Sequence, residues 1–130
     1  MSKNFNYNIN LDIKYKPLEL IDIPKIISDN KEQWFNQSLV TVNNSVVRVA
    51  IIEGEFHWHK HVNDDEFFYV IDGKLLIDLR ESIPSGEDKT VELNPREGFM
   101  VPKNVMHKTR APQKTVILMV ENVGVTPTGD

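Results

Sequence analysis

Three of the four histidines of this chain alternate within five residues, as His57, His59 and His61. Side chains at i and i+2 of a β-strand point to the same face, so His59 and His61 can aim two imidazoles at one point. A carboxylate, Glu66, follows, and the fourth histidine, His107, lies in another β-rich segment. Imidazoles and a carboxylate at such spacing indicate a site for a divalent transition metal.

His57 shares the alternating face, but three alternating residues of a strand span about 13 Å, too far for all three to meet one ion. We therefore interpret His57 as a residue near the site, lining a pocket or lying at the surface, rather than as a ligand. A histidine-rich surface strand is the alternative, and it would not account for the other ligand-type residues at their spacing.

Composition narrows the class of protein. The 130 residues suit one domain, and 40% hydrophobic with 26% charged residues is typical of a soluble globular protein. The net charge of −4, without a Lys/Arg cluster, argues against nucleic acid or an acidic membrane as partner. Without cysteine there is no disulfide and no thiolate ligand, so nitrogen and oxygen must hold any metal.

The N-terminus lacks the apolar stretch of a signal peptide, and no segment is long enough to span a bilayer. We expect a cytoplasmic protein.

The first 20 residues alternate loosely, which suits an extended arm or a first strand. Asp22 and Pro24 are typical of a helix start, and apolar residues up to Phe35 recur at roughly helical spacing. We predict one short amphipathic helix over 25–37, with Trp34 on it.

The rest of the chain is rich in short β-branched runs divided by turns. Asn43-Asn44 separates two such runs, and Asp72-Gly73 between hydrophobic runs predicts a β-hairpin. Strands are expected at 39–42, 46–52, 66–70, 74–80, 90–93, 99–101 and 115–120, with a loop at 84–88. This count favours an all-β barrel or sandwich.

The spacing His59-x-His61-x4-Glu66-x6-Gly73, followed by Pro102-x-Asn104-x2-His107, resembles the two motifs of the cupin superfamily. The resemblance covers about 39–123 and extends to short single-domain bacterial cupins, called mannose-6-phosphate-isomerase-like, whose function is not established. It implies a double-stranded β-helix, or jelly-roll barrel, with a short N-terminal helix. The single domain 1–130 would comprise an arm and helix (1–38), the barrel (39–123) and a tail (124–130).

The same resemblance implies that His59, His61, Glu66 and His107 are metal ligands. One divalent ion, Fe, Mn, Ni or Zn, would suit this set and keep room for water or substrate. Two glycines of the family pattern are replaced, one by Arg96 and one by Asn104. Asparagine tolerates positive φ, so we expect the turn at Asn104 to survive. Ala111 stands where the second motif ends in asparagine.

Alternation from Glu66 places Phe68 and Val70 on the same face of the strand as Glu66. Phe56 and Trp58 alternate with His57 and His59, so we expect them on the opposite face, packed on the helix or a partner subunit. Four side chains could contact a substrate carboxylate or phosphate, although solvated or packing roles are the commoner outcome: Arg48, Lys60, Tyr69 and Arg110. Asp64 or Asp65 could orient a histidine, or simply form a polar turn.

These observations favour an enzyme of oxygenase or isomerase type acting on a small polar organic molecule, because no separate general base or nucleophile is evident. The alternatives are a non-catalytic barrel that binds or senses a small ligand, with the metal as anchor, and a barrel with a structural metal. The resemblance also implies a homodimer.

Overall fold

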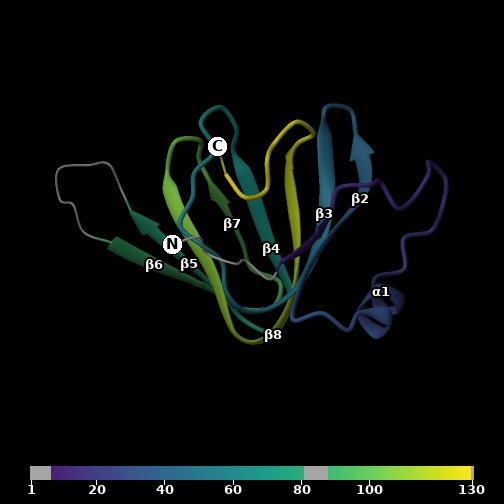
Figure 1. Cartoon of the computed structure of the whole chain (residues 1–130), viewed down its shortest axis with the longest axis horizontal. Coiled ribbons are helices and arrows are strands. Elements are labelled where there is room, and N and C mark those ends of the chain that lie inside the picture. Colours follow the sequence, from purple (N-terminus) through teal and green to yellow (C-terminus); the bar gives the residue numbers. More distant parts are fainter. Residues whose placement is uncertain (1–6, 81–87, 130) are drawn as a thin grey trace.

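The computed structural model describes residues 7–80 and 88–129, and these form an all-β fold with one short helix (Figure 1). The predicted fold class is confirmed. No helix in these two ranges is long and apolar enough to cross a membrane. The elements are β1 (Asn8–Asn10), α1 (Ile23–Asp29), β2 (Trp34–Val42), β3 (Ser45–Glu55), β4 (Glu66–Asp72), β5 (Leu75–Arg80), β6 (Asp88–Leu93), β7 (Gly98–Val101) and β8 (Met106–Asn122).

The long strand β8 joins the two sides of the molecule. It pairs antiparallel with β3 along most of its length, with β5 at its start and with β4 at its end. Figure 1 shows it curving beneath the other strands, from the β5–β6 pair on the left to β3 and β2 on the right. β1 adds to β2 in parallel, and β7 adds to β4. The sequence analysis predicted only the end of this strand, at 115–120.

The predicted hairpin at Asp72-Gly73 is wrong. β4 and β5 do not pair with each other, because each pairs with a different stretch of β8. The Asp-Gly sequence forms a corner between β4 and β5. Because β8 is long, β4 and β5 can each pair with a separate stretch of it. Gly73 has φ +92°, and a Cβ there would lie 2.8 Å from the Lys114 carbonyl oxygen. Only glycine lets the corner approach β8 this closely.

The predicted helix over 25–37 is shorter than expected. Asp22 caps its start by accepting a hydrogen bond from Lys25 N at 3.0 Å, and Asn30 ends it in an extended conformation. Trp34 then opens β2 opposite Ile52. Trp34 packs into the barrel interior and Phe35 onto the outer core. A strand with apolar residues on both faces resembles a helix over such a short window.

Apolar side chains form two cores. The inner core fills the space between the sheets and includes Trp34, Phe68, Val70 and Met119, so the inward placement of Phe68 and Val70 is confirmed. The outer core, around Ile26 of α1, covers the opposite face of β2 and β3. The alternating residues of β3 therefore contribute to both cores. The candidate site lies on the inner side.

Both glycine replacements keep the backbone conformation of a glycine. Arg96 has φ +71° and Asn104 has φ +69°. The turn at Asn104 is intact, as predicted, and its backbone N–H donates to the His61 carbonyl oxygen at 2.8 Å. The predicted loop at 84–88 lies outside the described residues, except that Asp88 begins β6.

We predict that Gly73→Ala lowers the free energy of unfolding by at least about 2 kcal/mol, because the new Cβ adds a clash with β8 to an unfavourable φ. Gly124→Ala is the matched control, since the nearest atom to a Cβ there is 4.0 Å away. Urea unfolding of both variants measures the difference. Equal stabilities would contradict the tight corner.

Candidate metal centre

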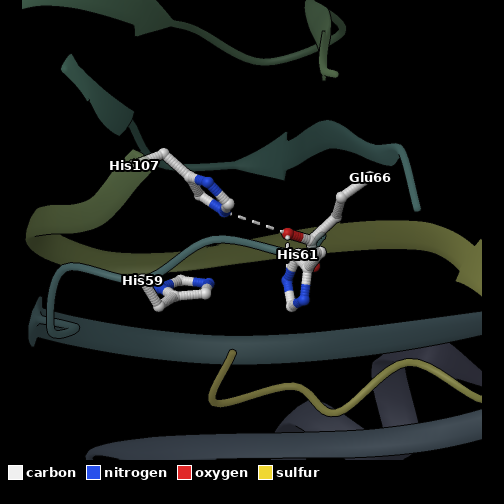
Figure 2. A group of neighbouring side chains, drawn as sticks. All are labelled: His59, His61, Glu66 and His107. Carbon is white, nitrogen blue, oxygen red and sulfur yellow. Dashed lines mark hydrogen bonds and ion pairs between the residues drawn. The ribbon is translucent and has the colours of Figure 1, made fainter. Parts of the chain in front are cut away.

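Four buried side chains from three parts of the chain converge on one point (Figure 2). His59 and His61 lie on the segment that joins β3 to β4, Glu66 is the first residue of β4, and His107 is the second residue of β8. One possible ligand atom from each lies within 4.8 Å of all the others. The structure thus brings together the four residues that the resemblance singled out.

Backbone hydrogen bonds hold the two motifs together. The His59 N–H donates to the His107 carbonyl at 2.9 Å, and the His107 N–H donates to the His59 carbonyl at 2.8 Å. Their rings lie side by side, with centroids 4.2 Å apart. A bend at 62–63 then changes which side chains face inward: the odd-numbered His59 and His61 do so before the bend, and the even-numbered Glu66 does so after it. Residues 41 positions apart in sequence meet for this reason.

Two of the three imidazoles have a fixed tautomer. Nδ1 of His59 lies 3.0 Å from the His57 carbonyl oxygen, and Nδ1 of His107 lies 2.9 Å from the Val105 carbonyl oxygen. A carbonyl oxygen only accepts, so each Nδ1 carries the hydrogen and donates it. Each neutral ring then keeps a lone pair on Nε2. The backbone therefore prepares two Nε2 atoms to bind a cation.

The polar atoms at the centre are incompletely satisfied by the protein. Glu66 Oε1 lies 3.3 Å from His107 Nε2 and 3.4 Å from His61 Nε2. His61 is 2% exposed, and neither of its ring nitrogens has a hydrogen-bond partner among the described residues. A neutral imidazole always carries one N–H, and leaving it buried and unpaired costs about 1–3 kcal/mol. The site lacks a partner for this ring.

A divalent cation fits this need. Bonds of about 2.1 Å to nitrogen or oxygen place opposite ligand atoms about 4.2 Å apart, near the 4.8 Å span of the four groups. Three imidazoles with one carboxylate suit first-row transition metals rather than calcium or magnesium. The donor set and the unpaired ring both match a metal ion.

The protonation states also suit a cation. Burial, followed by the neighbouring His107, lowers the pKa of His59 to about 4. Burial alone would raise the pKa of Glu66, but the close His107 and His61 rings outweigh it and hold that pKa below its usual range. At neutral pH the cluster therefore offers a neutral His59 and an ionised carboxylate, the forms that bind metals.

A second buried carboxyl lies behind the first. Glu121 of β8 stands opposite Glu66 of β4, and Arg48 Nε approaches Glu121 Oε1 to 2.7 Å with both side chains almost fully buried. Burial and the charge of Glu66 raise the pKa of Glu121 to about 9. Arg48 also donates to Ser38 Oγ at 3.1 Å. Arg48, a candidate contact for a substrate anion in the sequence, is thus paired with Glu121 inside the barrel.

A cavity of about 30 Å³ adjoins His59 and Glu66. It is lined by Trp34, Asn36, Ala50, Ile52, Phe56, His59, Glu66, Phe68, Thr109, Ile117, Met119 and Pro127. A separate groove of about 740 Å³ lies between the N-terminal arm and α1, and none of the four clustered residues lines it. The smaller cavity is therefore the one that adjoins the candidate metal ligands.

Phe56 does not occupy its predicted place. It is buried in the cavity wall, with its ring 5.0 Å from that of His59. The segment that carries it leaves β3 and contacts β8 irregularly, through the Phe56 N–H, which donates to the Thr109 carbonyl oxygen, and an isolated bridge at His59. Strand alternation therefore does not hold there. Trp58 does face outward, but it packs beneath the Arg80 guanidinium at 4.2 Å rather than on α1.

The remaining polar candidates have other contacts. His57 lies outside the group of four, and its Nε2 is 2.7 Å from the Thr128 carbonyl oxygen. Asp65 accepts a hydrogen bond from Lys103 N, and Arg110 donates to Asp78 at 2.8 Å. Neither Lys60 nor Tyr69 lines the cavity.

Fold and site together define a small jelly-roll protein with a buried cluster of three histidines and one glutamate. A family model described as "Cupin domain" matches residues 45–121. The uncharacterized protein YdbB of Bacillus subtilis (strain 168) is 37% identical over 97 residues, which cover 75% of this chain and 80% of YdbB. The chain belongs to the cupin family.

Solved structures agree on the fold. A cupin-2 domain protein from Shewanella frigidimarina NCIMB 400 superposes with a TM-score of 0.70 at 28% identity, covering 79% of this chain and 94% of that one. The hydroquinone 1,2-dioxygenase PnpCD, solved with Fe³⁺, superposes with a TM-score of 0.71 at 15% identity, covering 85% of this chain and 34% of that one. At that identity the second likeness shows the fold alone.

We predict that the metal-free protein loses stability in mild acid through His59. Its folded pKa of about 4 lies below the usual 6.5, so folding favours the neutral ring. The stabilisation is complete above about pH 6.5 and is lost as the pH falls toward 4, up to about 3 kcal/mol. Urea unfolding between pH 4 and 7 measures this loss. His59→Asn, which cannot take up the proton, should show a shallower slope; parallel slopes would contradict the assignment.

Proposed function

We propose that the chain binds one divalent transition metal ion through His59, His61, Glu66 and His107. The observation that carries the proposal is the buried convergence of these groups, with the His61 ring left unpaired by the protein. Two imidazoles already present Nε2 through backbone contacts. Iron, manganese, nickel and zinc all suit this donor set.

We further propose that the metal serves an enzyme of oxygenase or isomerase type that acts on a small organic molecule. A bound ion of this kind supplies a Lewis acid or, with iron or manganese, a redox centre. The cavity borders two of the four clustered residues and contains no cysteine or lysine that could act as a nucleophile. The dioxygenase with the same fold and a bound Fe³⁺ is consistent with this chemistry.

A non-catalytic barrel that binds or senses a small ligand is the second candidate. The small volume of the cavity favours it, because about 30 Å³ leaves little room for a substrate in this conformation. In that case the metal would anchor the ligand or stabilise the fold.

We also propose that residues 1–130 act as one cupin domain and that two copies associate. On the N-terminal arm Leu18 is fully exposed, at 106%, and Leu20 is 86% exposed. Association with a second copy would remove these apolar side chains from water.

Elemental analysis of protein prepared without a histidine tag tests the metal proposal. We expect about one equivalent of Fe, Mn, Ni or Zn, and loss of most of it in both His59→Ala and His107→Ala. His57→Phe is the matched control and should keep the metal, since His57 lies outside the cluster. A wild-type protein without metal after reconstitution, or equal loss in the control, would overturn the proposal.

The coordination of the ion distinguishes a reactive centre from a structural one. Four protein ligands leave at least one position for water on a five- or six-coordinate ion. We expect protein loaded with Mn²⁺ to enhance the relaxation of bulk water protons through an exchangeable water. A closed site, without that enhancement, would favour a structural metal.

A further inference from the structure

The walls of the cavity beside the cluster are mostly apolar. Aromatic and aliphatic side chains make up most of the lining, and the only side chain there with a full charge is Glu66. No lysine or arginine lines it, and Arg48 and Arg110 are engaged with carboxylates elsewhere. A second anionic group on a ligand would thus meet no cation in this cavity. The lining favours an uncharged, apolar body.

One polar atom of the wall has no partner. Asn36 is 7% exposed, and its Oδ1 has no hydrogen-bond partner among the described residues. The neighbouring Gln37 points away from the cavity and donates to the Asp12 and Ser38 carbonyls. An unpaired buried acceptor costs about 1–3 kcal/mol, and a donor on a ligand would recover this. Because Asn36 lines the cavity, this unpaired acceptor belongs to its wall.

The volume of the cavity limits what can enter. About 30 Å³ holds roughly two water molecules, whereas a cavity that binds benzene has about 150 Å³. An organic ligand needs one wall to move. Most of the lining belongs to paired strands of the inner core, but Pro127 belongs to the C-terminal tail that follows β8.

The tail packs against the segment that carries His57 and His59. His57 Nε2 lies 2.7 Å from the Thr128 carbonyl, and Gly129 packs so closely that a Cβ there would lie 2.6 Å from His59 Cβ. Val125, at the start of the tail, is buried. Figure 1 shows the yellow tail turning back from the end of β8 toward the middle of the molecule. None of its described residues, 126–129, belongs to a strand.

We propose that the cavity binds a compact, mainly apolar ring whose hydroxyl or N–H donates to Asn36 Oδ1, and that the tail from Thr126 to Gly129 lifts to admit it. The proposal rests on the proposed function, because it places this ligand beside the metal. It replaces the small polar molecule expected from sequence with an apolar one that carries a single donor. Asn36 is then the residue that determines specificity.

Phenol and anisole form the matched pair of probes, since they share a ring but only phenol has a donor. The test uses Zn²⁺-loaded full-length protein with labelled methyl groups, and it follows the cavity signals of Ile117 and Met119 during titration. We expect phenol to bind about tenfold more tightly than anisole, the worth of one hydrogen bond. Asn36→Leu should remove this preference, whereas Asn8→Leu, on an exposed asparagine, should keep it.

The same titration tests the tail. Phenol should shift the amide signals of Thr128 and Gly129, and His57→Phe, which keeps an aromatic ring but removes the donor to Thr128, should tighten phenol binding at least threefold. Unmoved tail signals in the bound state would overturn the lifting tail.

Metal content, measured on the same samples, distinguishes a failure of the ligand assignment from a failure of the proposed metal binding. A protein that holds zinc but shows equal affinity for phenol and anisole, or a preference that survives in Asn36→Leu, overturns the ligand assignment and leaves the metal proposal standing. A protein that takes up no zinc overturns the proposed function itself. A preference for phenol that Asn36→Leu abolishes supports the ligand assignment.

Discussion

The reciprocal pair of backbone hydrogen bonds between His59 and His107 is the contact on which the site depends. It fastens an irregular segment to the long strand β8 and sets the two rings side by side. Glu66 opens a different strand, yet its carboxylate lies 3.3 Å from His107 Nε2 because β4 also pairs with β8. The strand β8 therefore positions three of the four clustered groups: His59, Glu66 and His107.

The interior of the barrel divides into two chemical environments. On one side of the cluster, Glu121 and Arg48 surround Glu66 with a buried polar network. On the other side, aromatic and aliphatic side chains form the cavity. Such a division lets the polar network hold the carboxylate in place while the apolar walls exclude water, and exclusion of water strengthens electrostatic interactions at the centre.

The sequence predicted the fold and the cluster because both leave local signals. Alternation set His59 beside His61, and the family spacing connected them to Glu66 and His107. The misplaced features depend on contacts distant in sequence. Trp34 was assigned to a helix because its strand is buried on both faces, and Phe56 was assigned to the outer face because its segment looks like a regular strand.

Three further residues were missed for the same reason. Glu121 follows the predicted last strand at 115–120, although it shares the inward face of Ile117 and Met119. Asn36 lay within the predicted helix, so its inward position was not visible. The tail carried only turn residues, and nothing in them indicates that Gly129 packs on His59.

X-ray absorption at the edge of the bound metal tests the central claim most directly. The account predicts three imidazole nitrogens and a carboxylate oxygen at about 2.0–2.2 Å, with at least one further oxygen from water. A spectrum with fewer than two imidazoles, or an ion without a water ligand, would contradict a reactive centre formed by these four residues.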